Sequence, residues 1–142
     1  MTLIFASDHA GFELKKIIMG TISKNVRIID VGSKSKKQDD DYPVYATLGV
    51  QELKKHKNAL GIFVCGSGVG MAMAANRHKG IRAANVESKN AAVRSRREDN
   101  ANVLVLGSRL MSKNDALSIV RAWLNAKFTN AARHRRRLAM FS

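Results

Sequence analysis

Short runs of apolar residues alternate along the chain with longer segments in which apolar residues recur at helical spacing. The runs are residues 3–6, 26–30, 60–64, 80–86 and 103–106, and we expect each to form a β-strand. The amphipathic segments between them predict helices that begin near Phe12, Tyr42, Met71, Ser88 and Lys113. Strands that alternate with helices are typical of an α/β fold. We therefore expect a three-layer, Rossmann-like domain with a five-stranded parallel sheet and helices on both faces.

The chain reads as one unit, because its 142 residues show neither an internal repeat nor a linker. We expect a single domain over 1–142 that ends in a basic tail helix at about 130–141. No apolar run reaches the ~18 residues of a membrane span, and the N-terminus lacks the pattern of a signal peptide. The one cysteine, Cys65, excludes an intramolecular disulfide and is typical of a reducing compartment. These features favour a cytoplasmic protein without a membrane partner.

A strongly basic composition indicates what kind of partner the surface attracts. The formal net charge is +14, and one dense cluster, residues 133–137, contains four arginines. Other basic residues, such as Lys15, Arg94 and Arg96, are spread along the chain, and we expect much of this charge to lie on a solvated face. Such a surface attracts anions, so both phosphorylated metabolites and nucleic acid are open as partners.

A strand, a glycine-rich turn and a helix follow one another at residues 60–76, and the rest of the chain is organised around this stretch. The turn contains Gly66, Gly68 and Gly70, so several backbone N–H groups can converge at the start of the helix. Such a turn binds an anion, or an oxygen that becomes negative during a reaction. It fits neither the dinucleotide motif, whose third glycine would fall at Met71, nor the Walker phosphate loop.

Chemically useful side chains fall at the ends of three predicted strands. Asp8 and His9 follow the first strand, Cys65 and Ser67 the third, and Arg109 the fifth. The carboxyl ends of parallel strands meet at one edge of a sheet, so we expect these side chains to share a site. The sequence shows no metal-ligand spacing, and we expect neither a metal nor an organic cofactor. The set suits removal of a proton next to a carbonyl, with clustered N–H groups holding the enediolate.

Motifs spread over the whole chain resemble those of a known family. They are residues 7–15 (SDHAGFELK), 41–43 (DYP), 65–71 (CGSGVGM) with 74–76 (AAN), 80–83 (GIRA), and 102–104 (NVL) with 107–109 (GSR). In this order they resemble ribose-5-phosphate isomerase B, a sugar-phosphate isomerase family that also contains the galactose-6-phosphate isomerase subunits. The resemblance implies a sugar-phosphate substrate and a homodimer, or a dimer of dimers, with each active site at a subunit interface.

The resemblance also implies a role for each residue of the site. Cys65 would be the base that moves a proton between C1 and C2 of the sugar, and Ser67 would assist it. The enediolate would be stabilised by the backbone N–H groups of Gly66, Ser67, Gly68, Val69 and Gly70. The substrate would be bound by Asp8, His9, Tyr42, Asp99, Arg109, Arg133 and Arg137. The last two arginines are four residues apart, so on a helix they share a face and can clasp a phosphate together.

One segment departs from the family pattern. Before Asn102 the family has Ser-Arg-x-His-Asn, in which the histidine donates the proton that opens the sugar ring. Here Glu98 replaces the histidine and Asp99 replaces a substrate-binding asparagine. Glu98 can act as the catalytic acid only when protonated, whereas a glutamate of ordinary pKa is almost wholly ionised at neutral pH. The neighbouring Arg96 and Arg97 would favour the charged form further.

Three functions agree with these features. The first is an aldose–ketose isomerase that interconverts ribose 5-phosphate and ribulose 5-phosphate. The second is isomerisation of a six-carbon sugar phosphate of the allose or galactose 6-phosphate type, because Glu98 and Asp99 differ from the pentose pattern. The third is a catalytically impaired homologue that binds nucleic acid or other anions, but aromatic residues make up only 6% of the chain, which disfavours base stacking.

Overall fold

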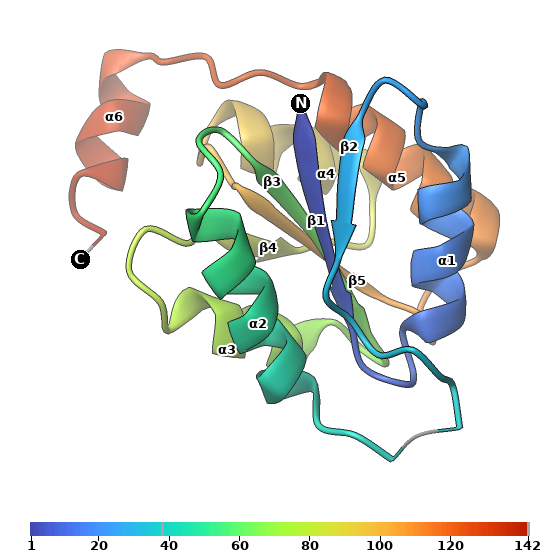
Figure 1. The fold of residues 1–142 in the computed structure, drawn as a ribbon. Coiled ribbons are helices and arrows are strands. Elements are labelled where there is room, and N and C mark those ends of the chain that lie inside the picture. The colour runs from blue at the N-terminus through green and yellow to red at the C-terminus, as the bar shows by residue number, and fades with distance from the viewer. Residues whose placement is uncertain (38, 142) are drawn as a thin grey trace.

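Five parallel strands form one sheet in the middle of the molecule, in the spatial order β2-β1-β3-β5-β4 (Figure 1). The strands are β1 (Thr2–Ser7), β2 (Arg27–Asp30), β3 (Leu60–Cys65), β4 (Ala83–Asn85) and β5 (Val103–Gly107). This computed structural model describes residues 1–37 and 39–141. The inner strands β1, β3 and β5 are buried along almost their whole length, as expected for a parallel sheet with both faces covered.

Helices cover both faces of the sheet. On one face lie α1 (Phe12–Thr21), α4 (Lys89–Arg97) and α5 (Lys113–Asn125), and on the other lie α2 (Tyr42–Lys54) and α3 (Val69–Asn76). Side chains alternate along β3, so that Ile62 and Val64 pack toward the first layer and Phe63 and Cys65 toward the second. The predicted three-layer α/β fold with a five-stranded parallel sheet is therefore confirmed.

The strand predicted at 80–86 is shorter than its apolar run, because β4 covers only Ala83–Asn85. Gly80 lies in a turn with a φ of +83°. The backbone N–H of Arg82 donates to the Asn102 side chain at 2.8 Å, outside the strand ladder. The predicted helix start at Ser88 is confirmed, since its hydroxyl accepts the Ala91 N–H at 3.2 Å.

The basic tail contains helix α6 (Ala132–Leu138), within the segment of about 130–141 that was predicted to be helical. An extended segment leads to it from α5 and places it away from the end of the sheet at which the strands finish (Figure 1). Thr129 connects this segment to α4, because its backbone N–H donates a hydrogen bond of 3.0 Å to the Arg97 carbonyl. Among the described residues, no helix combines the length and the apolar character that crossing a membrane requires.

Candidate active site

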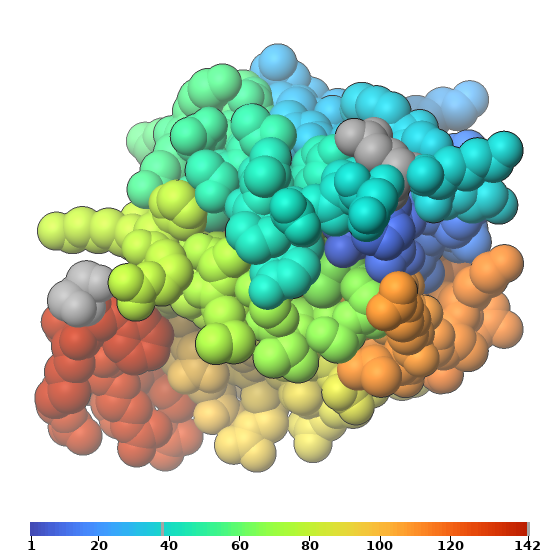
Figure 2. All heavy atoms as spheres, turned by 90° about the horizontal axis from the view of Figure 1, so that it is seen from below, coloured from blue at the N-terminus to red at the C-terminus, as the bar shows by residue number. Residues whose placement is uncertain are grey.

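A cavity of about 500 Å³ opens where β1, β3 and β5 end. Figure 2 looks onto this end of the sheet, where the first loop (blue), the segment before α2 (teal), the glycine-rich turn (light green) and the segment after β5 (orange) come together. The cavity is lined by Asp8, His9, Ala10, Asp39, Asp40, Asp41, Tyr42, Cys65, Gly66, Ser67, Val69, Gly70 and Arg109. The parallel topology thus brings together side chains that lie far apart in the sequence.

The glycine-rich turn gives the thiol a backbone partner. β3 ends at Cys65, which is 3% exposed, and Gly68 adopts a left-handed φ of +81° where α3 begins. This conformation places the Gly68 N–H 3.1 Å from Cys65 Sγ. A Cβ at position 68 would collide with Asn85 Oδ1, so the turn requires glycine there. The turn therefore directs a backbone hydrogen-bond donor at the sulfur.

Two other glycines of the turn make room for side chains of the site. A Cβ at Gly66 would lie 3.1 Å from the Arg109 guanidinium, and a Cβ at Gly70 would lie 2.5 Å from the Tyr42 hydroxyl. The Arg109 N–H also donates to the Gly66 carbonyl at 3.0 Å. Ser67 is exposed at the mouth of the turn. Arg109 and Tyr42 therefore rest directly against the loop that holds the thiol.

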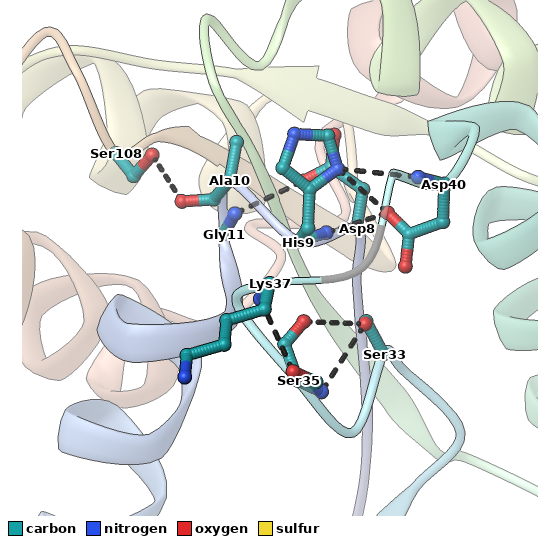
Figure 3. A network of polar contacts seen from close by, with 9 residues as sticks. All are labelled: Asp8, His9, Ala10, Gly11, Ser33, Ser35, Lys37, Asp40 and Ser108. Atoms are coloured by element: carbon teal, nitrogen blue, oxygen red, sulfur yellow. Dashed lines mark hydrogen bonds and ion pairs between the residues drawn. The ribbon is translucent and has the colours of Figure 1, made fainter.

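Asp8 and His9 extend from the end of β1 into the cavity. The Asp8 carboxylate accepts the Gly11 N–H at 2.9 Å, and burial raises the pKa of this carboxyl above its ordinary value. His9 Nδ1 lies 2.8 Å from Asp40 Oδ1, and the same oxygen accepts the His9 backbone N–H at 2.7 Å (Figure 3). The hydrogen bond to Asp40 raises the pKa of His9 above 6.5. The cavity thus contains an imidazole that keeps its second proton to higher pH than usual.

A buried lysine holds the segment that leads to Asp40. Lys15 is fully buried, and its Nζ donates to both carboxylate oxygens of Asp30, at 2.8 and 2.9 Å, and to the Ser33 carbonyl at 2.9 Å. Burial lowers the pKa of Lys15, and Asp30 offsets part of this effect. The expectation that this residue contributes to a solvated face was wrong. It is instead an internal cation that fixes the chain after β2.

The remaining predicted site residues lie elsewhere on the chain. Glu98 and Arg133 line a second cavity of about 420 Å³, and Asp99 lines a third of about 400 Å³. Arg137 lies on α6, one helical turn beyond Arg133. Within one chain the predicted residues therefore form two groups, and these four lie outside the cavity that contains Cys65.

Glu98 is held as a carboxylate by an arginine one turn earlier on α4. Nε and Nη2 of Arg94 lie 3.1 and 3.3 Å from Oε1 and Oε2 of Glu98. This bidentate contact lowers the pKa of Glu98, and the nearby charges of His134 and Arg133 lower it further. At neutral pH the carboxyl at this position is therefore ionised.

The prediction that Arg96 would act on Glu98 was wrong. Arg96 Nη1 donates to the Ala101 carbonyl at 2.7 Å, and its guanidinium lies 5.3 Å from the centre of the Trp123 ring. Burial lowers the pKa of this guanidinium. Arg96 therefore joins α4 to the core beside α5, and Arg94 is the residue that pairs with Glu98.

Asp40 is the site residue that sequence reasoning missed. Its only local signal is the run of three aspartates at 39–41 before the Tyr-Pro pair. Its contact with His9 joins residues 31 positions apart, and no local pattern specifies such a pair. Within residues 1–37 and 39–141, no group of three or more His, Cys, Asp or Glu side chains has the arrangement of a metal site.

The fold and the cavity define an α/β protein with a polar ligand site at the carboxyl edge of a parallel sheet, furnished with a thiol, a His–Asp pair and an arginine. The chain belongs to the Ribose/Galactose Isomerase family, whose family model matches residues 3–141. The resemblance found in the motifs is thereby confirmed.

Individual relatives match along nearly their whole length. The ribose-5-phosphate isomerase B of Escherichia coli is 37% identical over 137 residues, which cover 96% of this chain and 91% of that protein. The crystal structure of ribose 5-phosphate isomerase from Thermotoga maritima has a TM-score of 0.92 and 39% identity, and the match covers 99% of this chain and 96% of that one. The structure of ribose-5-phosphate isomerase B from Mycoplasma genitalium with bound ribulose-5-phosphate has a TM-score of 0.90 and 42% identity, with 97% and 91% covered.

Proposed function

We propose that this protein is an aldose–ketose isomerase that interconverts ribose 5-phosphate and ribulose 5-phosphate through an enediolate, without a metal or organic cofactor. The observation that carries the proposal is its match in fold and sequence to an isomerase solved with bound ribulose-5-phosphate. A coupled assay on ribose 5-phosphate tests it, and absence of turnover by the folded protein contradicts it. Because a catalytic thiol must stay reduced, we place this single-domain enzyme in the cytoplasm.

In the proposed reaction Cys65 acts as a thiolate base. It removes the proton from C2 of open-chain ribose 5-phosphate, and the electron pair moves to the carbonyl oxygen on C1, which gives an enediolate. The thiol then returns the proton to C1, while a proton moves from the oxygen on C2 to the oxygen on C1 and leaves a carbonyl at C2. The Gly68 N–H supports the thiolate, other N–H groups of the turn stabilise the enediolate, and the Ser67 hydroxyl assists the base.

Substrate binding is divided between the two groups of residues. Asp8, His9, Tyr42 and Arg109 line the cavity beside the thiol and would hold the sugar phosphate there. Arg133 and Arg137 would clasp the phosphate, because a one-turn separation on α6 places both guanidinium groups on one side of the helix. Asp99 would contact the substrate, and Glu98 would stand at the ring-opening position.

A second copy of the chain would bring the two groups together, and we propose a homodimer or a dimer of dimers with the site at the subunit interface. α2 and α3 carry exposed apolar side chains next to the cavity, namely Val44 (56% exposed), Leu48 (41%), Val69 (51%) and Met73 (68%). Exposed apolar side chains on two neighbouring helices support a protein interface there.

Complementation between two inactive variants tests the shared site. At substrate concentrations below the wild-type KM, Cys65→Ala and Arg137→Ala should each lose most activity. Mixing them after dissociation and reassociation should restore about one quarter of wild-type activity, because half of the dimers then have one intact site. No recovery on mixing, with heterodimers present by native mass spectrometry, contradicts an interfacial site.

A six-carbon sugar phosphate is the second candidate substrate. It is favoured by the ionised Glu98 and by Asp99, two carboxylates where the pentose pattern has a histidine and an asparagine. Comparison of kcat/KM for ribose 5-phosphate with those for allose and galactose 6-phosphate decides between the two. A salt-dependent titration with nucleic acid in the same series tests the alternative suggested by the net charge of +14.

A further inference from the structure

Asp40 contacts His9 at two points with a single carboxylate oxygen. Oδ1 accepts the His9 backbone N–H at 2.7 Å and lies 2.8 Å from His9 Nδ1 (Figure 3). The Asp40 backbone nitrogen lies farther from the same ring atom, at 3.5 Å, and could donate only to an unprotonated Nδ1. The shorter contact to a charged acceptor dominates, so Nδ1 carries a proton that it donates to Asp40.

The surroundings of Asp40 keep its charge and its position fixed. The side chain is 8% exposed, and Oδ2 is buried without a hydrogen-bond partner among the described residues. Burial alone would raise the pKa of this carboxyl, but its interactions with His9, Ser33 and Tyr45 outweigh burial and keep the pKa below its ordinary value. Ser33 is itself held by two hydrogen bonds. Its backbone N–H donates to the Ser7 carbonyl at 2.7 Å, and its carbonyl accepts from Lys15 Nζ.

We infer that Asp40 is a positioning residue for the substrate. It orients the His9 ring through Nδ1 and keeps the ring cationic, so that Nε2–H, on the opposite side of the ring, is available to donate to an anionic oxygen of the sugar phosphate. This role rests on the proposed function, since it assigns the ligand that His9 meets in the cavity. Asp40 itself does not touch the reacting atoms.

The other charged and titratable groups on the cavity wall are Asp8, Asp39, Asp41, Tyr42, Cys65 and Arg109. Of these, Asp8 adds to the stabilisation of the imidazolium, whereas partial removal of the ring from water opposes it. Of the described residues, Asp40 is the one whose side chain lies at hydrogen-bond distance from the ring, so it sets the charge state of His9.

NMR titration of the labelled imidazole measures this effect in the full-length protein. In the wild type, His9 should titrate above 6.5. In Asp40→Asn, which keeps the shape and an acceptor oxygen but removes the charge, it should titrate near that ordinary value. The matched control is Glu52→Gln, which removes the carboxylate from another His–carboxylate pair, the 3.0 Å contact between Glu52 on α2 and His56 just beyond that helix. This variant should leave the His9 titration unchanged. An unchanged His9 titration in Asp40→Asn overturns the inference.

The substrate arm measures KM for ribose 5-phosphate against pH. Below the ordinary histidine pKa both proteins carry the imidazolium, so the ratio of KM values, variant to wild type, should be near one. It should reach about tenfold at pH above 6.5, where only the wild type keeps the charge, and fall again above the raised pKa of His9. kcat should change less than KM, and Glu52→Gln should leave KM unchanged. A ratio that does not depend on pH overturns the inference.

Inorganic phosphate separates failure of this inference from failure of the proposed function. In the wild type, saturating phosphate should raise the pKa of His9 further, and the rise should be smaller in Asp40→Asn. This measurement needs no turnover, so it stands even if the protein isomerises no sugar phosphate or if Asp40→Asn does not fold. Absence of any response of His9 to phosphate in the wild type contradicts its role as a hydrogen-bond donor to an anion.

Discussion

Replacement of Glu98 by histidine should increase turnover of ribose 5-phosphate, which enters the reaction as a closed ring. Opening that ring requires an acid, and general acid catalysis contributes about 10²–10⁴-fold to a rate. A glutamate with its ordinary pKa of 4.5 is about 0.3% protonated at pH 7, and the bidentate contact with Arg94 lowers this fraction further. In the wild type Glu98, at the proposed ring-opening position, is therefore almost entirely ionised.

A histidine at this position would supply far more of the acid form. With a pKa of 6.5 it is about 25% protonated at pH 7, roughly a hundredfold gain over an unperturbed glutamate. Arg94 disfavours a second cation nearby, so we expect a gain of about tenfold in kcat/KM from ribose 5-phosphate for Glu98→His. Ribulose 5-phosphate has no such ring to open, so its initial rate should change much less.

The assay measures initial rates in both directions for both proteins, with the open-chain fraction controlled. Arg94→Gln is the companion variant, because it keeps Glu98 but removes the contact that holds it ionised. The protonated fraction of Glu98 rises as the pH falls toward its pKa, so this variant should gain activity near pH 5 and hardly at all at pH 8. Equal effects of Glu98→His in the two directions, or a loss of activity, would refute the reasoning and make Glu98 an adapted catalytic group.

Three further changes have expected outcomes. Cys65→Ala should lower kcat by several orders of magnitude with little effect on the far-ultraviolet circular dichroism spectrum, and near-normal turnover would exclude Cys65 as the base. Arg137→Ala should raise KM for sugar phosphates at least about tenfold through loss of a bidentate phosphate contact. The control, Arg135→Ala at a neighbouring exposed position, should leave KM unchanged. Equal KM values for the two variants would contradict the proposed contact of Arg137 with the phosphate. Gly68→Ala should lower the free energy of unfolding by at least ~1–2 kcal/mol, because φ there is +81° and a Cβ meets Asn85, and urea denaturation measures this loss.

The sequence predicts the sheet well where burial leaves a single interpretation. β3 and β5 are apolar on both faces because helices cover both sides, so their runs stand out from any amphipathic pattern. The glycine-rich turn is predictable for a similar reason, since Gly68 meets a steric demand that no other residue satisfies. The apolar run at 80–86 was misleading, because Ile81 is buried although it lies in the loop before β4 and not in the strand.

Contacts between distant segments could not be predicted from the sequence. Lys15 is indistinguishable from a surface lysine until β2 places Asp30 against it. The pairing of His9 with Asp40 depends likewise on where the loop after β2 returns to the sheet. Both pairings follow from the packing of elements and not from local propensity. The contact of Arg94 with Glu98 is different, because residues four apart on a helix share a face, so the spacing of charges could have predicted it.

The separation of the two residue groups has a consequence for how such a protein changes over evolutionary time. The thiol and the glycine-rich turn belong to the sheet edge, while Glu98 and Asp99 follow the end of α4 and the tail arginines lie on α6. A substitution at the end of α4 leaves the packing around Cys65 untouched, so the two groups can diverge at different rates. Both replacements in the ring-opening motif fall in the α4 group. Under the proposed assignment of roles, the fold therefore allows selection to alter which sugars are accepted while the proton-transfer residues stay fixed.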